Sequence, residues 1–295
     1  MPSLDAAACA EMMDALTEIA ARASEAILQV AGRAQVRNKD DGSPVTEADE
    51  ASEAAITDGL KRLAPSVPVV SEEQASRDRP KTSDRGSYFL VDPLDGTKEF
   101  ISGRPEYTVN IAIVTDGVPI LGVVTAPAAG IAWRGIVGRG AERLPIAGGS
   151  IAAGSIQGPN QGPIQDPIKG PIHVRKRSGD EIAVMVSRSH LEDRTKAFIQ
   201  RFPQTKLVQC GSSVKFCRLA EGAADLYARL APTHDWDIAA GHAVLAAAGG
   251  IVTAPDGSRL RYGSDDLLIP EFLAWGDRAW NEEASREGTY GVSVR

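Results

Sequence analysis

The stretch that decides the fold is Tyr88–Phe100, which reads YFLVDPLDGTKEF. Its apolar start is typical of a short buried strand, and that strand runs directly into two aspartates, Asp92 and Asp95. These carboxylates are three residues apart around a Pro-Leu turn, so both can converge on one point. Gly96 and Thr97 follow at an expected helix start, where backbone N–H groups favour phosphate. The segment therefore predicts that functional carboxylates lie at the edge of a sheet.

Further acidic groups lie far from this segment along the chain. Glu72-Glu73 follows the apolar run 67–70, which we expect to be a second strand, and Trp236-Asp237 lies in the second half. With the two aspartates of the first segment they supply four separated acidic groups, with no His or Cys among them. Hard oxygen ligands of this kind select Mg²⁺ or Mn²⁺ over zinc.

A cluster of carboxylates a few ångströms apart repels itself unless cations neutralise it. Two metal ions about 3.5–4 Å apart can hold an attacking water on one side of a phosphorus atom and stabilise the leaving oxygen on the other. Each motif alone has an ordinary explanation: Asp-Gly as a turn, Glu72-Glu73 as a solvated pair, and Trp236-Asp237 as a helix cap beside a core aromatic residue. Their joint occurrence favours the metal interpretation.

Length and composition limit the class of protein. At 295 residues, two packed domains or one large layered domain is expected. The content of 43% hydrophobic and 24% charged residues is typical of a globular protein. A formal net charge of -7 argues against a protein that coats nucleic acid, because such proteins need a basic surface, but it permits a small anionic ligand.

The sequence shows no pattern of export or membrane insertion. Three scattered cysteines are too few for a disulfide framework and lack the spacing of a zinc site, which favours a reducing cytoplasm. The first residues are acidic where a signal peptide is basic, and no apolar run reaches the roughly 18 residues of a spanning helix. We expect a cytoplasmic protein, with peripheral attachment to the cytoplasmic face of the inner membrane as the alternative.

Periodicity predicts an α+β first half, residues 1–140. Apolar residues recur every three or four positions over 12–27, which predicts a helix that ends near Gly32, and Thr46 is placed to cap a second helix that runs through Leu63. The β-rich runs 108–115 and 119–125 are separated by Asp116-Gly117, a strong hairpin signal.

The second half, residues 181–295, has an α/β rhythm. The expected order is strand 182–186, helix 192–202, strand 206–208, helix 213–220, strand 225–230 and helix 237–248. Between the halves, residues 141–180 form an expected insertion, because the run 140–170 is rich in Gly and Pro and lacks hydrophobic periodicity. We interpret this run as an exposed loop or loose hairpin, with a substrate lid as the alternative.

Three motifs resemble, in order, the signature of the lithium-sensitive inositol monophosphatase superfamily: Glu72-Glu73, then DPLDGT at 92–97, then WDIAAG at 236–241. Other segments resemble its bisphosphate nucleotidase branch: TKEFI at 97–101, VSRSH at 186–190 and GSSVKF at 211–216. Inositol monophosphatases themselves usually have Thr-Asn-Phe after the Gly-Thr. The resemblance covers the chain from about residue 14 to residue 268, except for the Gly/Pro-rich insertion.

The resemblance implies an α/β fold, the layered αβαβα sandwich of the inositol monophosphatase type. It also implies two or three Mg²⁺ ions, with Mn²⁺ as an alternative, and inhibition by lithium. The implied metal ligands are the carboxylates identified above and one main-chain carbonyl, which comes from the resemblance alone. They are Glu72, Asp92, Asp95, Asp237 and the carbonyl of Leu94.

The resemblance further implies that Thr97, assisted by Asp49, holds the attacking water, with Glu72 as a further catalytic group. Asp49 lies three residues after Thr46, so a capping box is its alternative role. Lys215 and Arg229 suit a second, non-hydrolysed phosphate. The implied substrate-binding residues are Gly96, Thr97, His190, Ser212, Ser213, Lys215, Arg229 and Asp237.

The implied reaction is hydrolysis of the 3'-phosphate of adenosine 3',5'-bisphosphate to AMP and phosphate, which removes a by-product of sulfur assimilation. The same chemistry on inositol phosphates, fructose 1,6-bisphosphate or 3'-phosphoadenosine 5'-phosphosulfate is the near alternative. A non-enzymatic protein that binds a cation or RNA is the distant one. His234 and His242 fall outside the pattern, and we expect them to support the site or the fold.

Overall fold

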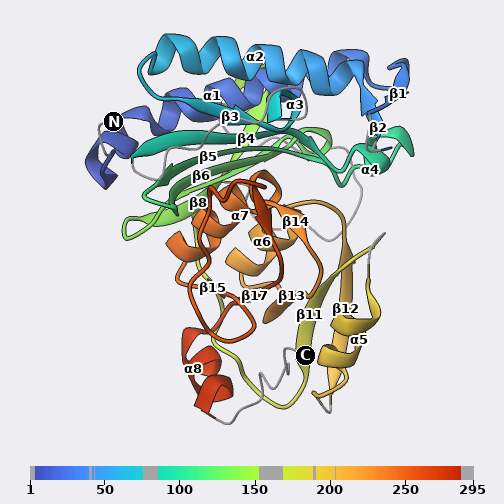
Figure 1. Cartoon of the computed structure of the whole chain (residues 1–295), viewed down its shortest axis with the longest axis vertical. Helices are drawn as coiled ribbons and strands as arrows, with labels where there is room; N and C mark the ends of the chain where they lie inside the picture. The colour runs from blue at the N-terminus through green and yellow to red at the C-terminus, as the bar shows by residue number, and fades with distance from the viewer. Residues whose placement is uncertain are drawn as a thin grey trace.

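The computed structural model describes residues 4–39, 42, 44–75, 86–152, 169–188, 191–202 and 204–286. Helices and sheets alternate in five layers (Figure 1). Helices α1 and α2 cover one face of a large sheet, and α6 and α7 lie between this sheet and a smaller one. Helices α5 and α8 pack on the outer face of the smaller sheet. The predicted αβαβα layering is confirmed.

The outer layer consists of α1 (Ala6–Val30) and α2 (Glu47–Leu63). The Asp5 side chain accepts hydrogen bonds from two backbone N–H groups of the first turn of α1, and the Thr46 side chain caps α2. Both helices are as predicted. The short hairpin of β1 (Val36–Asn38) and β2 (Pro44–Thr46) connects them.

The large sheet has eight strands in the order β10-β8-β7-β6-β5-β4-β3, with β9 beside β8. Only β3 and β4 are parallel neighbours among these described strands; the other pairs are antiparallel. The strands are β3 (Val69–Ser71), β4 (Ser87–Asp95), β5 (Thr108–Thr115), β6 (Val118–Ala126), β7 (Ile131–Ile136), β8 (Gly140–Ala147), β9 (Ser150–Ile151) and β10 (Gly170–Ile172). Short helices lie between them: α3 (Glu72–Ala75), α4 (Thr97–Ile101) and the 3-10 turn η1 (Pro127–Ala129).

In this sheet, the predicted hairpin is present, but part of the predicted loop is a strand. The hairpin at Asp116-Gly117 is confirmed, and both residues adopt positive φ, 50° and 73°, as its tight turn requires. The loop expected from residue 140 is wrong over 140–147, because these residues form β8, a largely buried strand paired with β7 and β10. Within the rest of the expected insertion, 150–151 and 170–172 form β9 and β10, and 153–168 lie outside the described residues.

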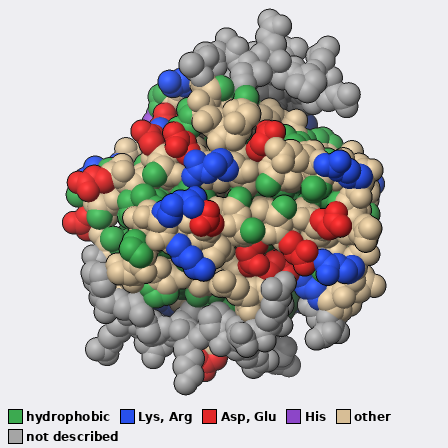
Figure 2. Space-filling view, turned by 90° about the horizontal axis from the view of Figure 1, so that it is seen from above, with side chains coloured by type: hydrophobic (Ala, Val, Ile, Leu, Met, Phe, Trp, Pro, Cys, Tyr) green, Lys and Arg blue, Asp and Glu red, His purple; other side chains and the backbone are tan. Residues whose placement is uncertain are grey.

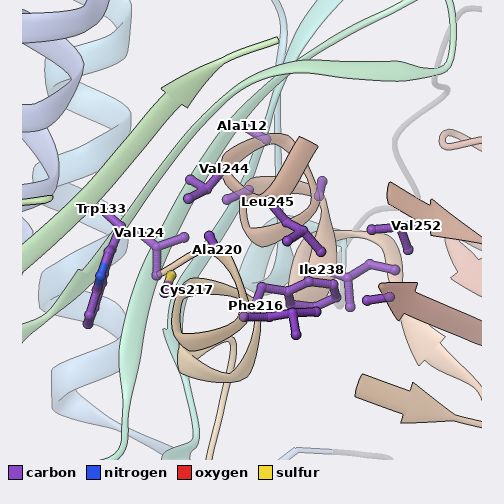
Figure 3. Close-up of a cluster of buried hydrophobic side chains, with 14 of the residues drawn as sticks. Ala112, Val124, Trp133, Phe216, Cys217, Ala220, Ile238, Val244, Leu245 and Val252 are labelled. Atoms are coloured by element: carbon purple, nitrogen blue, oxygen red, sulfur yellow. The ribbon is translucent and has the colours of Figure 1, made fainter. Parts of the chain in front are cut away.

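The middle layer contains α6 (Val214–Ala220) and α7 (Asp235–Ala247). Helix α7 lies very close to β6, since a Cβ atom on Gly122 would stand 2.1 Å from the carbonyl oxygen of Ala240. Side chains of both helices and both sheets form the main core, in which Phe216 and Ile238 point from the helices towards the smaller sheet, and Val124 and Trp133 project from the larger sheet (Figure 3).

The smaller sheet has the order β12-β11-β13-β17-β15. Its strands are β11 (Ile182–Ser187), β12 (Thr205–Cys210), β13 (Leu226–Arg229), β15 (Ile251–Thr253) and β17 (Phe272–Trp275). The outer helices are α5 (Asp193–Ile199) and α8 (Arg278–Arg286), and a separate pair is formed by β14 (Thr233–His234) and β16 (Leu268–Ile269). The predicted α/β order of this half is confirmed, with shifts of a few residues at the ends.

The face over α1 and α2 carries acidic and basic side chains in alternation (Figure 2). Of the helices described, none combines the length and apolar character needed to cross a bilayer.

Candidate active site

The predicted carboxylates meet at one edge of the large sheet. Strands β3 and β4 are parallel, with Ser71 paired to Val91, so Glu72 and Asp92, the next residues of each chain segment, lie side by side. Beyond Asp92, β4 carries one extra residue relative to β5, because Asp92 pairs with Asn110 and Asp95 with Thr108. This bulge redirects the end of the strand.

A cavity of about 280 Å³ opens at this edge and is lined from both halves of the chain. We call it the active-site cavity. Asp92 and Leu94 are buried behind its wall. Most of the other predicted site residues line it: Glu72, Asp95, Gly96, Thr97, Ser212, Ser213, Lys215, Arg229 and Asp237. A second cavity of about 370 Å³ near Phe100 is lined mainly by apolar residues, with Thr46, Tyr107 and Arg104 but no carboxylate, so it lacks this chemistry.

Burial and mutual repulsion disfavour ionised carboxylates at this edge. Burial raises the pKa of Glu72 to about 7 and that of Asp95 to about 7, with the charge of Asp237 adding to both shifts. Burial also raises the pKa of Asp92 well above its usual range, and the charges of Glu72 and Asp95 push it further. These carboxylates are therefore close enough to oppose one another's ionisation.

Lys39 supplies positive charge to this edge. Its Nζ lies 2.8 Å from Oε1 of Glu72 and 2.7 Å from Oε1 of Glu73. The Lys39 side chain is only 10% exposed, so both contacts are largely shielded from water. No sequence signal pointed to Lys39, since a single lysine in a polar loop is unremarkable.

Thr97 and Asp49 are brought together although they lie on different elements. Thr97 Oγ1 lies 3.3 Å from Oδ1 of Asp49 and 3.2 Å from the carbonyl oxygen of Leu94. The other oxygen of Asp49 accepts bonds of 2.8 Å and 2.7 Å from the backbone and side chain of Thr46. Asp49 thus completes the capping box of α2 and also reaches Thr97. Burial raises its pKa to about 6.

The start of α6 is joined to the carboxylate edge by short hydrogen bonds. The backbone N–H of Ser213 donates to Asp95 at 2.5 Å, and its hydroxyl lies 2.8 Å from Thr108 Oγ1 and 2.6 Å from Asn110 Oδ1. Ser212 before it adopts a positive φ of 46°, which is uncommon outside glycine. Its carbonyl accepts a 2.6 Å bond from Lys215 Nζ, which helps to hold this conformation.

Two cations face the carboxylate edge across the cavity. The Lys215 side chain is almost fully buried and lies over the Tyr227 ring, with Nζ 5.2 Å from its centroid. Arg229 donates to the carbonyl of Pro232 at 3.2 Å, while its Nε is buried without a hydrogen-bond partner in the described structure. Neither cation has a carboxylate within 4.0 Å among the described residues. Both are therefore available to an anionic ligand.

Comparison with known proteins agrees with this geometry. The chain matches the inositol monophosphatase family over residues 9–287. It belongs to that family. The 3'(2'),5'-bisphosphate nucleotidase CysQ of Shigella flexneri is 40% identical over 274 residues, which cover 88% of this chain and 98% of that protein. The CysQ of Escherichia coli strain K12 is 40% identical over 268 residues, with the same coverage.

Solved structures of the inositol monophosphatase family share the fold. The crystal structure of CysQ from Bacteroides thetaiotaomicron matches with a TM-score of 0.71 and 34% identity, over 91% of this chain and 98% of that one. The Thermotoga maritima inositol monophosphatase also gives a TM-score of 0.71, at 23% identity, over 94% of this chain and 97% of that one. This second likeness concerns the fold alone.

The donor set of this inositol monophosphatase family member fits a hard divalent cation. Its oxygen donors are self-repelling and draw a lysine ammonium into the cluster. Within the described part of the chain, no group of three or more His, Cys, Asp or Glu side chains is arranged to hold a metal ion. The metal-ligand assignments therefore stay predictions.

The structure also shows the surroundings of Asp237, His234 and His242. Asp237 accepts a 3.1 Å bond from the backbone N–H of His234 at the start of α7, and a bond from Thr233. The ring of His234 stacks on Trp236 at 4.4 Å, a pair that the sequence did not predict. His242 Nδ1 lies 2.8 Å from the Tyr262 hydroxyl, as a structural role requires. His190 lies outside the described residues.

Proposed function

We propose that this chain is a 3'(2'),5'-bisphosphate nucleotidase that hydrolyses adenosine 3',5'-bisphosphate to AMP and phosphate. The observation that carries the proposal is the active-site cavity itself, in which a carboxylate edge faces the buried Lys215 and the half-buried Arg229, neither with a carboxylate partner in the described structure. A substrate with two phosphates can place one phosphate at the carboxylate edge and the other beside the two cations. The identity of 40% to nucleotidases of this name supports the same reaction.

Glu72, Asp92, Asp95, Asp237 and the Leu94 carbonyl are the proposed ligands of two or three Mg²⁺ ions, with Mn²⁺ as an alternative. When bound, these ions supply charge to the scissile phosphate and lower the pKa of water. Inhibition by lithium is carried over from the family resemblance.

The residues around Thr97 orient the attacking water. Because the hydroxyl of Thr97 can donate a hydrogen bond to Oδ1 of Asp49, its lone pairs are left to accept a hydrogen bond from the attacking water. Asp49 is held by two hydrogen bonds from Thr46, so its Oδ1 lies beside the Thr97 hydroxyl before substrate binds. The proposed hydrolysis involves no covalent enzyme intermediate.

The opposite side of the cavity selects the substrate. Lys215 and Arg229 are proposed to hold the 5'-phosphate through charge-assisted hydrogen bonds, which are roughly twice as strong as neutral ones. Gly96 and Thr97 are proposed to contact the 3'-phosphate. His190, Ser212 and Ser213 are proposed to contact the nucleotide.

A phosphate-release assay with Mg²⁺ tests the proposal. Adenosine 3',5'-bisphosphate, inositol 1-phosphate and fructose 1,6-bisphosphate are compared by kcat/KM. We expect the nucleotide to be preferred by about tenfold or more, which corresponds to about 1.4 kcal/mol. A preference for either of the other two substrates would assign the same chemistry to a different pathway, and no phosphate release from any of them would contradict the enzymatic proposal.

A further inference from the structure

An ion pair joins the two halves of the chain beside the active-site cavity. Arg188 follows β11 of the smaller sheet, and Glu106 lies in the loop 102–107 between α4 and β5 of the larger one. Arg188 Nε donates to Oε2 of Glu106 at 2.8 Å, and Nη2 donates to Oε1 at 2.7 Å. We call this bidentate pair the clasp. Its planar geometry fixes both distance and orientation.

The backbone of Glu106 is wedged between the two loops that carry the two sides of the cavity. A Cβ atom on Gly96 would stand 3.0 Å from the Glu106 carbonyl oxygen. A Cβ atom on Gly211 would stand 2.8 Å from the same oxygen and 3.0 Å from Glu106 Cβ. Gly96 belongs to the turn after Asp95, and Gly211 precedes Ser212 at the start of α6. A shift of Glu106 therefore moves one loop relative to the other.

Helix α6 is linked to the large sheet at both ends. At the far end, Glu221 accepts a 2.9 Å bond from Arg143 and a 2.7 Å bond from Trp133, both on the large sheet. At the near end, Ser213 bonds to Asp95, a proposed metal ligand, and to Thr108 and Asn110 of β5. The clasp lies beside this near end, because Glu106 contacts Gly211, and neither of its residues is a proposed metal ligand or substrate-binding residue.

The clasp is too exposed to be a major source of stability. Its side chains are 35% and 23% exposed, and pairs in contact with water contribute little to the free energy of folding. Its effect is expected in geometry. A misplacement of about 1 Å in an oriented reaction can lower the rate by about 10²-fold.

We propose that Glu106 and Arg188 are positioning residues that set the span between the carboxylate edge and the Lys215–Arg229 side, and thereby select substrates with two phosphates. The inference rests on the proposed function. A bisphosphate must fit both sides at once, so its hydrolysis depends on the span. A 3'-monophosphate uses only the carboxylate edge, so its hydrolysis does not.

The test compares wild type with Glu106→Gln, Arg188→Met and the double variant. kcat and KM are measured for adenosine 3',5'-bisphosphate and adenosine 3'-monophosphate. We expect the ratio of the two kcat/KM values to fall by about tenfold in each single variant, mainly through KM for the bisphosphate. The double variant is expected to be no worse than either single one, because both act through the same contact.

Two controls isolate the clasp. Glu271→Gln breaks the Arg194–Glu271 pair, which lies within the second half and away from the cavity, and it should leave the ratio unchanged. Arg188→Lys retains the charge but loses the bidentate geometry; it is expected to reduce the ratio, and it keeps the test possible if Arg188→Met does not fold. Thermal unfolding of every variant checks the fold.

The outcomes separate the two proposals. A wild type without preference for the bisphosphate overturns both the proposed function and the clasp. A wild type that prefers the bisphosphate, with variants that keep this preference within about twofold, overturns the clasp alone. Equal losses on both substrates also overturn it, because they would indicate general support of the site.

Discussion

At the residue scale, the charge of Lys39 balances buried carboxylates in the metal-free protein. Its ammonium contacts Glu72 and Glu73, and the Glu73 side chain is only 4% exposed. Removing one partner of a buried ion pair leaves an uncompensated charge, which costs more than the pair contributes. We therefore predict that Lys39→Met lowers the free energy of unfolding in chelator by about 3 kcal/mol.

Chemical denaturation in the presence of a chelator measures this loss. Arg62→Met is the matched control, because the Arg62–Asp58 pair is 65% exposed on both sides and should contribute less than about 0.5 kcal/mol. Added Mg²⁺ should restore part of the stability of Lys39→Met, since a cation replaces the missing ammonium. Equal stability of the two variants in chelator would show that Lys39 does not compensate the cluster.

His242 gives a pH-dependent prediction at the same scale. Burial lowers its pKa from 6.5 to about 4, so the folded state holds the neutral ring beside Tyr262. Its contribution to stability is fully present above pH 6.5 and is lost as the pH falls towards 4, because the unfolded chain binds the proton first. His242 as a whole is half-buried, so we expect a loss of about 1–2 kcal/mol over this window.

The measurement compares the pH dependence of unfolding for wild type, His242→Gln and His173→Gln. His173 is exposed, so its variant should retain the wild-type dependence. The free energy of unfolding of His242→Gln should change less with pH than that of the wild type between pH 6.5 and 4. The same slope in all three proteins would rule out His242 as the titrating group.

At the element scale, the close contact of α7 with β6 positions Asp237. Because a Cβ on Gly122 would overlap the Ala240 carbonyl, Gly122→Ala must displace the helix that carries Asp237. We predict a loss of stability of about 1–3 kcal/mol together with reduced turnover.

Gly276→Ala is the control for this substitution. Its nearest neighbour would be the Ala224 carbonyl at 3.4 Å, an ordinary contact, so stability should stay within about 1 kcal/mol of wild type. Turnover and denaturation are measured on the same samples. Wild-type turnover in Gly122→Ala would mean that the position of α7 is not critical.

Local sequence signals predicted most elements, but they failed where pairing is long-range. The Asp116-Gly117 hairpin was predictable because its turn residues impose the positive φ values themselves. Strand β8 was not, because a strand with Gly140 and Pro145 in its sequence is stabilised by its pairing with β7 and β10. Proline is disfavoured inside strands, so at Pro145 the strand pairing overrides the local preference of the residue.

At the scale of the whole molecule, the site is a junction between two halves of one chain. The sequence predicted which carboxylates meet, because they follow strand ends and match a family signature. It did not predict Lys39 or the Glu106–Arg188 clasp, because these contacts depend on how loops from different layers are placed. Local patterns carry no information on that placement.

In the proposed reaction, one side of the cavity hydrolyses a phosphate while the other side holds a second phosphate. The most direct test measures kcat/KM for adenosine 3',5'-bisphosphate and adenosine 3'-monophosphate in wild type, Lys215→Met and Arg229→Met, with thermal unfolding as a check of the fold. We predict that each variant loses about tenfold or more of its preference for the bisphosphate, about 1.4 kcal/mol, while hydrolysis of the monophosphate changes little. Equal losses on both substrates would contradict the account.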